Sequence, residues 1–220
     1  MDKLNYTDKA ALEIVKNFCS YFVDLKAKLY IYKELFENDK AKLIMESTAK
    51  SFFLEINQII VNTLLLEFAK ISDRGYDNGV KRENFTVENL IDSINWPENI
   101  KERLEELKKK AGFFHSLIKK ARNRLLAHYD KEAFLSDKAL GEFTPEQEVE
   151  FIETLQEICD IIHQACFGSI VGDIVMSMPG QGDVQDLKKA LKKAIAYDRF
   201  FSEGNTEEKT KLLKFLHGIE

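Results

Sequence analysis

The chain has 220 residues and a mass of 25.4 kDa, which fits one folded domain with at most a small appendage. Apolar residues make up 45% of it and charged residues 31%, a balance that excludes a disordered chain. Ten glycines and three prolines are too few for a β-sandwich or a β-barrel, and a formal net charge of −5 offers little general attraction for nucleic acid.

The first half of the chain predicts two long helices and one short one. Apolar residues recur every three or four positions over residues 7–37 and again over residues 40–71. A cluster of turn-forming residues at 72–79 then interrupts the pattern. A short helix is expected over residues 87–94, with Thr86 as its N-cap.

The strongest periodic signal predicts a long central helix that begins with Pro97 at its first position. Its apolar positions follow one another at intervals of four and three residues, as on the buried stripe of a bundle helix. We call these nine positions the apolar seam: Ile100, Leu104, Leu107, Ala111, Phe114, Ile118, Ala121, Leu125 and His128.

The central helix is also the most basic part of the chain. Residues 101–128 hold nine basic and three acidic residues, and hence a net charge of +6 in a protein whose total is −5. A basic stripe on an acidic protein is typical of a local phosphate-binding groove. A solvated helix face has the same composition, so composition alone leaves both interpretations open.

The remaining third predicts more helices. Thr144 opens one with a capping box and a following proline, and its apolar pattern continues toward Met178. After a second break at residues 177–183, two shorter helices are expected, over about 184–203 and 206–217. The sequence therefore predicts an all-α bundle of four or five helices over residues 1–178 and a helical C-terminal extension, packed on it, over residues 179–220.

Arg122, Asn123 and His128 form the pattern R-N-x-x-x-x-H at the end of the basic helix. This pattern resembles the signature of the HEPN superfamily, in which an arginine and a small polar residue precede a histidine late in a four-helix bundle. The segments Leu-Ala-His-x-Asp-Lys at 126–131 and Asn-Phe-Thr-Val-Glu-Asn-Leu at 84–90 are similar to its abortive-infection, AbiU-type branch. The resemblance covers roughly residues 10–170 and implies a HEPN-like bundle.

The resemblance further implies a metal-independent endoribonuclease with no cofactor, acting in bacterial defence or as a toxin held in check by an antitoxin or other regulatory protein. His128 would be the acid/base catalyst, because histidine exchanges protons near neutral pH. Arg122 would stabilise charge on the phosphate, and Asn123 would position the phosphate or the catalytic pair. RNA would be held by a larger set of residues: Lys108, Lys109, Lys110, Lys119, Lys120, Arg124 and Tyr129.

The spacing of the motif raises a geometric problem. Six residues of an ideal helix rotate by about 600°, so Arg122 and His128 lie about 120° apart around the axis. Either the helix distorts near Leu126, or a second copy of the chain completes the site. The family resemblance implies the second arrangement, a homodimer with both motifs along one composite cleft.

Other interpretations stay open for each of these residues. His128 falls on the apolar seam, where a histidine is usually a satisfied core residue. Arg124 suits an ordinary surface charge, and Tyr129 and Asp130 suit a helix cap. A non-catalytic helical module that binds RNA, a nucleotide or a protein partner is the main alternative function. A helical assembly protein with no small ligand is a further one.

The cysteines bear on the location and on metals. Cys19, Cys159 and Cys166 are odd in number and contain no C-x-x-C pair, which favours a reducing cytoplasm. Cys159, His163 and Cys166 share a helix face, but the two cysteines lie about 10 Å apart along the axis, too far for one zinc ion, so no metal site is expected. The N-terminus does not read as a signal peptide, and no apolar stretch approaches the roughly 20 residues of a membrane span, so no membrane contact is expected.

Overall fold

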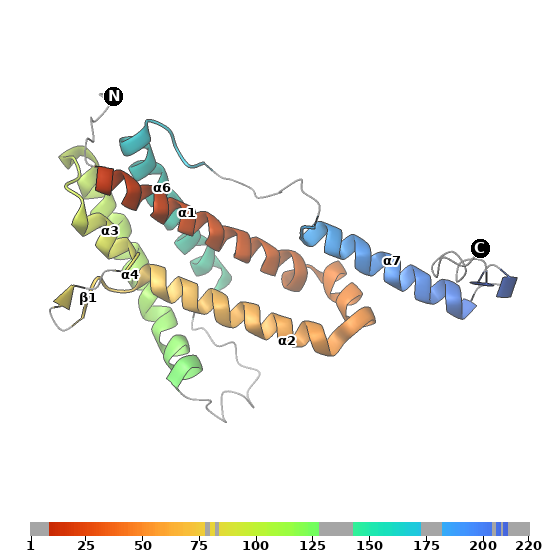
Figure 1. Cartoon of the computed structure of the whole chain (residues 1–220). Helices are drawn as coiled ribbons and strands as arrows, with labels where there is room; N and C mark the ends of the chain where they lie inside the picture. The colour runs from red at the N-terminus through yellow and green to blue at the C-terminus, as the bar shows by residue number, and fades with distance from the viewer. Residues whose placement is uncertain are drawn as a thin grey trace. The chain divides into compact units, whose positions relative to one another are not determined.

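The structure is a computed structural model that describes residues 9–77, 80–81, 84–127, 143–172, 182–203, 206–207 and 209–210. The described part of the chain is all-α, as the sequence predicts, apart from one ladder of two-residue strands (Figure 1). Its described helices, the short strands and one π-helical segment run in this order: α1 (Lys9–Tyr32), η1 (Lys33–Glu37), α2 (Asp39–Ser72), β1 (Tyr76–Asp77), β2 (Val80–Lys81), α3 (Val87–Ser93), α4 (Glu98–Ala127), α6 (Pro145–Phe167) and α7 (Val184–Glu203).

The chain divides into two compact units. The first combines residues 1–29 with 60–175, and the second combines residues 30–59 with 176–220. The predicted boundary between residues 178 and 179 falls within 173–181, outside the described residues, and stays a prediction.

Four helices share the core of the first unit. Its largest fully buried side chains come from α1, the C-terminal half of α2, α4 and α6: Val15, Phe18, Phe22, Leu25, Phe68, Ile71, Leu104, Leu107, Ile118, Leu155, Ile158 and Ile162. The spacing of these residues at three and four positions is what turns one apolar stripe of each helix inward. Seam residues Leu104 to Ile118 of α4 are all buried, which confirms the predicted face of that helix up to this point.

Local signals place most helix ends where the sequence predicts them. The Thr86 hydroxyl accepts from the Asn89 N–H and caps α3, and Thr144 and Gln147 form both bonds of the capping box at the start of α6. The Asp183 carboxylate accepts from the second and third N–H groups of α7. Pro97 precedes the first helical residue of α4 instead of occupying it, and its carbonyl accepts from Lys101.

The end of α6 differs from the prediction. The helix ends at Phe167 instead of continuing toward Met178, because Gly168 takes the left-handed conformation (φ 74°) and its N–H bonds back to the Gln164 carbonyl. Gly172 also has a positive φ of 70°. Its N–H donates to Asp160, and its carbonyl accepts from Gln156. The two glycines therefore end a helix and shape a turn.

The turn after α2 packs tightly on α3. Gly75 donates its N–H to the Glu88 carboxylate at 2.7 Å, and a Cβ added at Gly75 would lie 2.1 Å from Oδ1 of Asn89. Only glycine fits this approach without a shift of its neighbour. The predicted break at residues 72–79 therefore also contains a specific contact, that of Gly75 with Glu88 and Asn89 of α3.

The second unit has a small core of its own. Leu35 of η1, Met45 and Phe53 of α2 and Val184 of α7 form it, with Leu191 packed against it. Glu34 accepts from Lys188 at 2.5 Å and from Gln185 at 2.8 Å, which fixes α7 to η1. These bonds hold the pKa of Glu34 below its ordinary value.

The α2 helix is long and apolar enough to cross a membrane by length and composition, contrary to the prediction that no stretch approaches that length. Its most apolar window has a mean hydropathy of 1.4, and 28% of that window is buried. A core helix of a soluble protein passes the same test, so this is weak evidence for a membrane, and the fold is consistent with a soluble protein. The helix is also kinked: Ala49 has φ −144° and ψ 62°, next to Ser47 and Thr48, whose hydroxyls bond to carbonyls of the preceding turn.

Candidate functional site

Arg122 and Asn123 of the motif lie near the end of α4. Arg122, Asn123 and Arg124 belong to its last two turns, and the backbone stays α-helical through Ala127. A distortion near Leu126 is therefore not observed. The side chains of residues 120–127 lie outside the described part of the structure, and so do His128, Tyr129 and Asp130 entirely. The relation between Arg122 and His128 accordingly stays a prediction.

The basic residues of α4 fall into two groups. Arg103 binds Glu157 of α6 with two hydrogen bonds of 2.7 and 2.9 Å, and Lys108 binds Asp92 of α3 and Glu105, each at 2.7 Å. From the middle of the helix onward, Lys109, Lys110 and Lys119 are exposed, and Lys101 near its start is exposed beside Glu98 at 4.0 Å. Beyond Lys108, exposed lysines therefore continue along α4 toward the end that carries the motif.

Lys108 differs from its neighbours because its ammonium group is already occupied. Its side chain is only 23% exposed. Burial alone would lower the pKa of Lys108, but the hydrogen bonds to Asp92 and Glu105 outweigh it and raise that pKa. This arrangement fits a structural link between α3 and α4, whereas the sequence predicted a contact with RNA.

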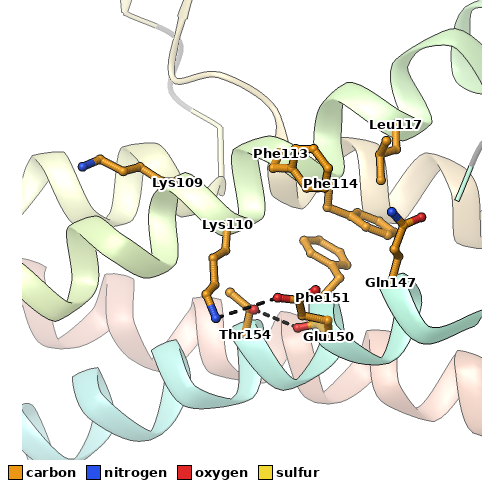
Figure 2. Close-up of a pocket in the computed structure, with 9 residues that line it drawn as sticks. All are labelled: Lys109, Lys110, Phe113, Phe114, Leu117, Gln147, Glu150, Phe151 and Thr154. Atoms are coloured by element: carbon orange, nitrogen blue, oxygen red, sulfur yellow. Dashed lines mark hydrogen bonds and ion pairs between the residues drawn. The ribbon is translucent and has the colours of Figure 1, made fainter. Parts of the chain in front are cut away.

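A cavity of about 280 Å³ lies between α4 and α6, and we call it the α4–α6 pocket (Figure 2). Its α4 wall consists of Lys109, Lys110, Phe113, Phe114 and Leu117, and its α6 wall of Gln147, Glu150, Phe151 and Thr154.

The base of the pocket is aromatic. The rings of Phe114 and Phe151 stack at 4.0 Å with an interplanar angle of 9°, and Phe68 of α2 meets both of them edge-on at 6.0 and 5.8 Å. Phe113, the neighbour of Phe114 in sequence, is instead 60% exposed. The pocket therefore combines an apolar floor of packed rings with the ring of Phe113, which is mostly exposed to solvent.

Polar groups stand at the edges of the pocket. Lys110 Nζ lies 3.8 Å from Glu150 Oε1, and this ion pair joins the two walls, whereas Lys109 extends away from the stacked rings (Figure 2). Gln147 accepts from the Thr144 N–H through Oε1, and Thr154 donates its hydroxyl to the Glu150 carbonyl. The pocket thus offers a lysine, a carboxylate and the amide nitrogen of Gln147 around an apolar interior.

The pocket is not among the sites predicted from the sequence. Phe114 was expected on the apolar seam, which is correct, but Phe113 and the α6 residues were not considered. A signal was present, since Lys109, Lys110 and Phe113 are spaced as neighbours on one helix face. The stacking of Phe114 on Phe151 could not have been found in the same way, because it joins residues 37 positions apart.

In the described part of the chain, His115 and the cysteine–histidine face of α6 have structural roles. His115 is buried, with Nδ1 3.2 Å from the Ser72 hydroxyl and Nε2 3.6 Å from Asp73. Cys159 is buried, which raises the pKa of its thiol, and His163 donates through Nδ1 to the Ser169 carbonyl at 2.6 Å. No group of three histidine, cysteine or acidic side chains among the described residues could hold a metal ion.

The comparison with protein families agrees with this arrangement. The sequence profile of the AbiU2 family, HEPN_AbiU2, matches residues 8–189. The chain belongs to the AbiU2 family of HEPN proteins. The match includes the Arg122–His128 motif and reaches the first turns of α7, beyond residue 170, where the sequence resemblance was expected to end. The all-α bundle is thus a HEPN-type fold, and the family is one of abortive infection. Neither a search of curated proteins nor a search of solved structures found a match.

Proposed function

We propose that this AbiU2-family chain is a metal-independent endoribonuclease of bacterial defence. The observation that carries the proposal is the position of the R-N-x-x-x-x-H motif: it stands at the end of the most basic helix of a HEPN-family bundle. The enzymatic activity, its cytoplasmic location and control by an antitoxin or another protein partner are all parts of the proposal.

The proposed reaction needs only side-chain groups. His128 accepts the proton of a ribose 2′-hydroxyl while the 2′-oxygen attacks the adjacent phosphorus, and the bond from phosphorus to the 5′-oxygen breaks. The leaving 5′-oxygen takes a proton from the imidazolium of His128 or of its counterpart in a second copy. The products are a 2′,3′-cyclic phosphate and a 5′-hydroxyl. Arg122 stabilises the charge that develops on the phosphate, and Asn123 holds the phosphate in position.

The geometry of α4 supports a site shared between two copies. Arg122 lies in a regular α-helix that continues to Ala127, so a helix that simply continued would put His128 about 120° away around the axis. A homodimer solves this problem if the arginine of one protomer lies beside the histidine of its partner. Light scattering that finds a monomer at micromolar concentration would count against this arrangement.

RNA binding is assigned mainly to phosphate contacts. Lys109, Lys110 and Lys119 are exposed on α4, and Lys120, Arg124 and Tyr129 belong to the same predicted set. The seventh member, Lys108, already binds Asp92 and Glu105. Phosphate contacts make affinity fall with salt concentration, by a slope of about −0.7 per contact for a single strand. The affinity for RNA should therefore depend steeply on salt.

The test is cleavage of end-labelled RNA in EDTA by the parent protein, by His128→Ala and by His163→Asn as a matched control. Cleavage by the parent and the control, with cyclic phosphate ends and no cleavage by His128→Ala, is the expected result. Equal cleavage by all three proteins would assign the activity to another site or to a contaminant. Absence of cleavage in all three would reject the nuclease.

One observation favours a second candidate function, a non-catalytic module that binds RNA, a nucleotide or a protein partner. The net charge of −5 is unfavourable for a protein that must attract long nucleic acids in general. Under this alternative, His128 is a core residue of the apolar seam. RNA binding that is the same in the parent and in His128→Ala, with no cleavage by either, would support it.

A further inference from the structure

We propose that the α4–α6 pocket is a base-binding subsite for single-stranded RNA. One unpaired base enters the pocket and stacks on Phe113, while the phosphates on either side of that nucleotide lie at Lys109 and Lys110. The inference rests on the proposed function only in taking RNA as the substrate. It assigns a role to side chains that lie on α4 before the motif begins.

The size and lining of the pocket suit a single planar ring system. Its volume of about 280 Å³ lies just below the roughly 300–1,000 Å³ of ordinary ligand sites, so it is too small for a large cofactor. The interior is formed by Phe113, Phe114, Leu117 and Phe151. The stacked pair of Phe114 and Phe151 is held in place by Phe68, so this floor is in position before a ligand binds.

The ring of Phe113 is not buried in the core and is therefore accessible to a ligand. A single exposed apolar residue is normal on a protein surface. Phe113 differs because its ring is 60% exposed, lines a cavity and belongs to a helix whose other aromatic residue, Phe114, is 3% exposed. Every base has a flat face that can stack on such a ring, which is how proteins hold single strands without reading sequence.

Charge next to Phe113 selects a phosphate-bearing ligand. Lys109 and Lys110 precede Phe113 by four and three residues, so the three residues are neighbours on the helix surface. Both lysines line the pocket and are exposed. Glu150 compensates only Lys110, at 3.8 Å, and an arriving phosphate replaces that weak contact.

The hydrogen-bonding groups narrow the kind of base edge that fits. Gln147 uses Oε1 to accept from Thr144, so its amide nitrogen is the group left to face a ligand, and it donates. Thr154 donates its hydroxyl proton to the Glu150 carbonyl, so this proton is not the one that a ligand would meet. A base edge that accepts hydrogen bonds, such as a carbonyl oxygen or an unprotonated ring nitrogen, therefore matches the pocket.

The helix register connects the pocket with the motif. Residues 120 and 124 follow Phe113 by seven and eleven positions, so they return to within about 20° of its angular position, about 10 and 16 Å farther along α4. Both are basic in this sequence, Lys120 and Arg124. An RNA strand with one base in the pocket can thus follow a single face of the helix toward the proposed cleavage site.

The test uses binding of a labelled single-stranded RNA with 2′-O-methyl groups, which cannot be cleaved by 2′-oxygen attack. Fluorescence anisotropy would compare the parent protein with Phe113→Ala, Phe113→Tyr and Phe85→Ala, since Phe85 is an exposed control at 50%. Loss of one base stack weakens binding by about 5- to 150-fold, so Phe113→Ala should show a loss in that range. Phe113→Tyr keeps the ring and should retain the affinity, as should Phe85→Ala.

A second probe makes the test specific for a base. The same RNA with abasic sites should bind the parent as weakly as Phe113→Ala binds the intact RNA, and the two losses should not add. Equal binding of intact RNA by the parent and Phe113→Ala would overturn the subsite and leave the nuclease proposal intact. Binding that depends on Phe113 in a protein that cleaves nothing would retain the subsite and reject the nuclease.

The remaining outcomes are also decisive. Failure of the parent to bind the methylated RNA would overturn the subsite, because the pocket makes no use of the 2′-hydroxyl. Loss of self-association in Phe113→Ala without a loss of RNA affinity would assign this face to a second copy of the chain, which also overturns the proposal.

Discussion

The two groups of lysines on α4 should separate in a salt-dependence experiment. We consider the double variant Lys109→Ala/Lys119→Ala against Lys108→Ala, in the same non-cleavable RNA assay. Lys109 and Lys119 are exposed, whereas Lys108 already binds Asp92 and Glu105 at 2.7 Å. The double variant removes two phosphate contacts if both lysines bind RNA, and Lys108→Ala removes none.

The magnitude follows from counterion release. Two lost contacts should make the slope of log K against log salt shallower by about 1.4, at about 0.7 per contact with a single strand. Between about 50 and 200 mM salt, the factor by which RNA affinity falls should therefore be about seven times larger for the parent than for the double variant. Lys108→Ala should keep the parent slope and instead lower the free energy of unfolding by up to about 1 kcal/mol, because the partly buried link between α3 and α4 is broken.

The assay is anisotropy at four or more salt concentrations, with urea unfolding of each variant as the control for stability. Equal slopes in the parent and the double variant would refute the assignment of Lys109 and Lys119 to RNA. A slope change in Lys108→Ala as large as that of one exposed lysine would refute the structural role of Lys108.

Two further predictions concern the fold. Gly75→Ala should lower the free energy of unfolding in urea by about 1–3 kcal/mol, because the added Cβ would lie 2.1 Å from Asn89 Oδ1. Gly112→Ala is the control: its added Cβ has no neighbouring atom within 4 Å, so it should stabilise α4 by up to about 1 kcal/mol, and equal effects of the two variants would contradict the clash at Gly75. The contact of Glu34 with Lys188 should stabilise α7 above pH 4.5 and lose that contribution as the pH falls through the depressed pKa of Glu34. Thermal melting from neutral to acid pH should therefore show an acid loss in the parent that is smaller in Lys188→Ala, and an identical loss in both proteins would contradict it.

Elements that depend on local chemistry could be predicted from the sequence. The caps at Thr86 and Thr144 lie where the side chain and the following residues specify them, and the seam from Leu104 to Ile118 follows from its spacing alone. The family could also be recognised, because Arg122, Asn123 and His128 are close in sequence.

The features that could not be predicted depend on contacts between distant segments. The apolar run after Ile158 has the composition of a helix, but the helix ends at Gly168, and Asp160 and Gln156 then hold the chain around Gly172. In the sequence Lys108 belongs to a basic run, and its ion pair with Asp92 of α3 forms only when the two helices pack together. The α4–α6 pocket exists only once both helices are packed, so no pattern within either helix defines it.

The ion pair between Lys110 and Glu150 affects the number of phosphate contacts that the salt dependence of RNA affinity reports. A lysine in free solution holds diffuse anions, whereas Lys110 is already balanced by a carboxylate of its own protein at 3.8 Å. When a phosphate takes that place, Glu150 is released and gathers cations from the buffer, which offsets part of the cations that the RNA gives up. The salt slope of the intact protein should then understate the number of phosphates it binds, and Glu150→Gln should bind RNA more tightly while showing a steeper slope.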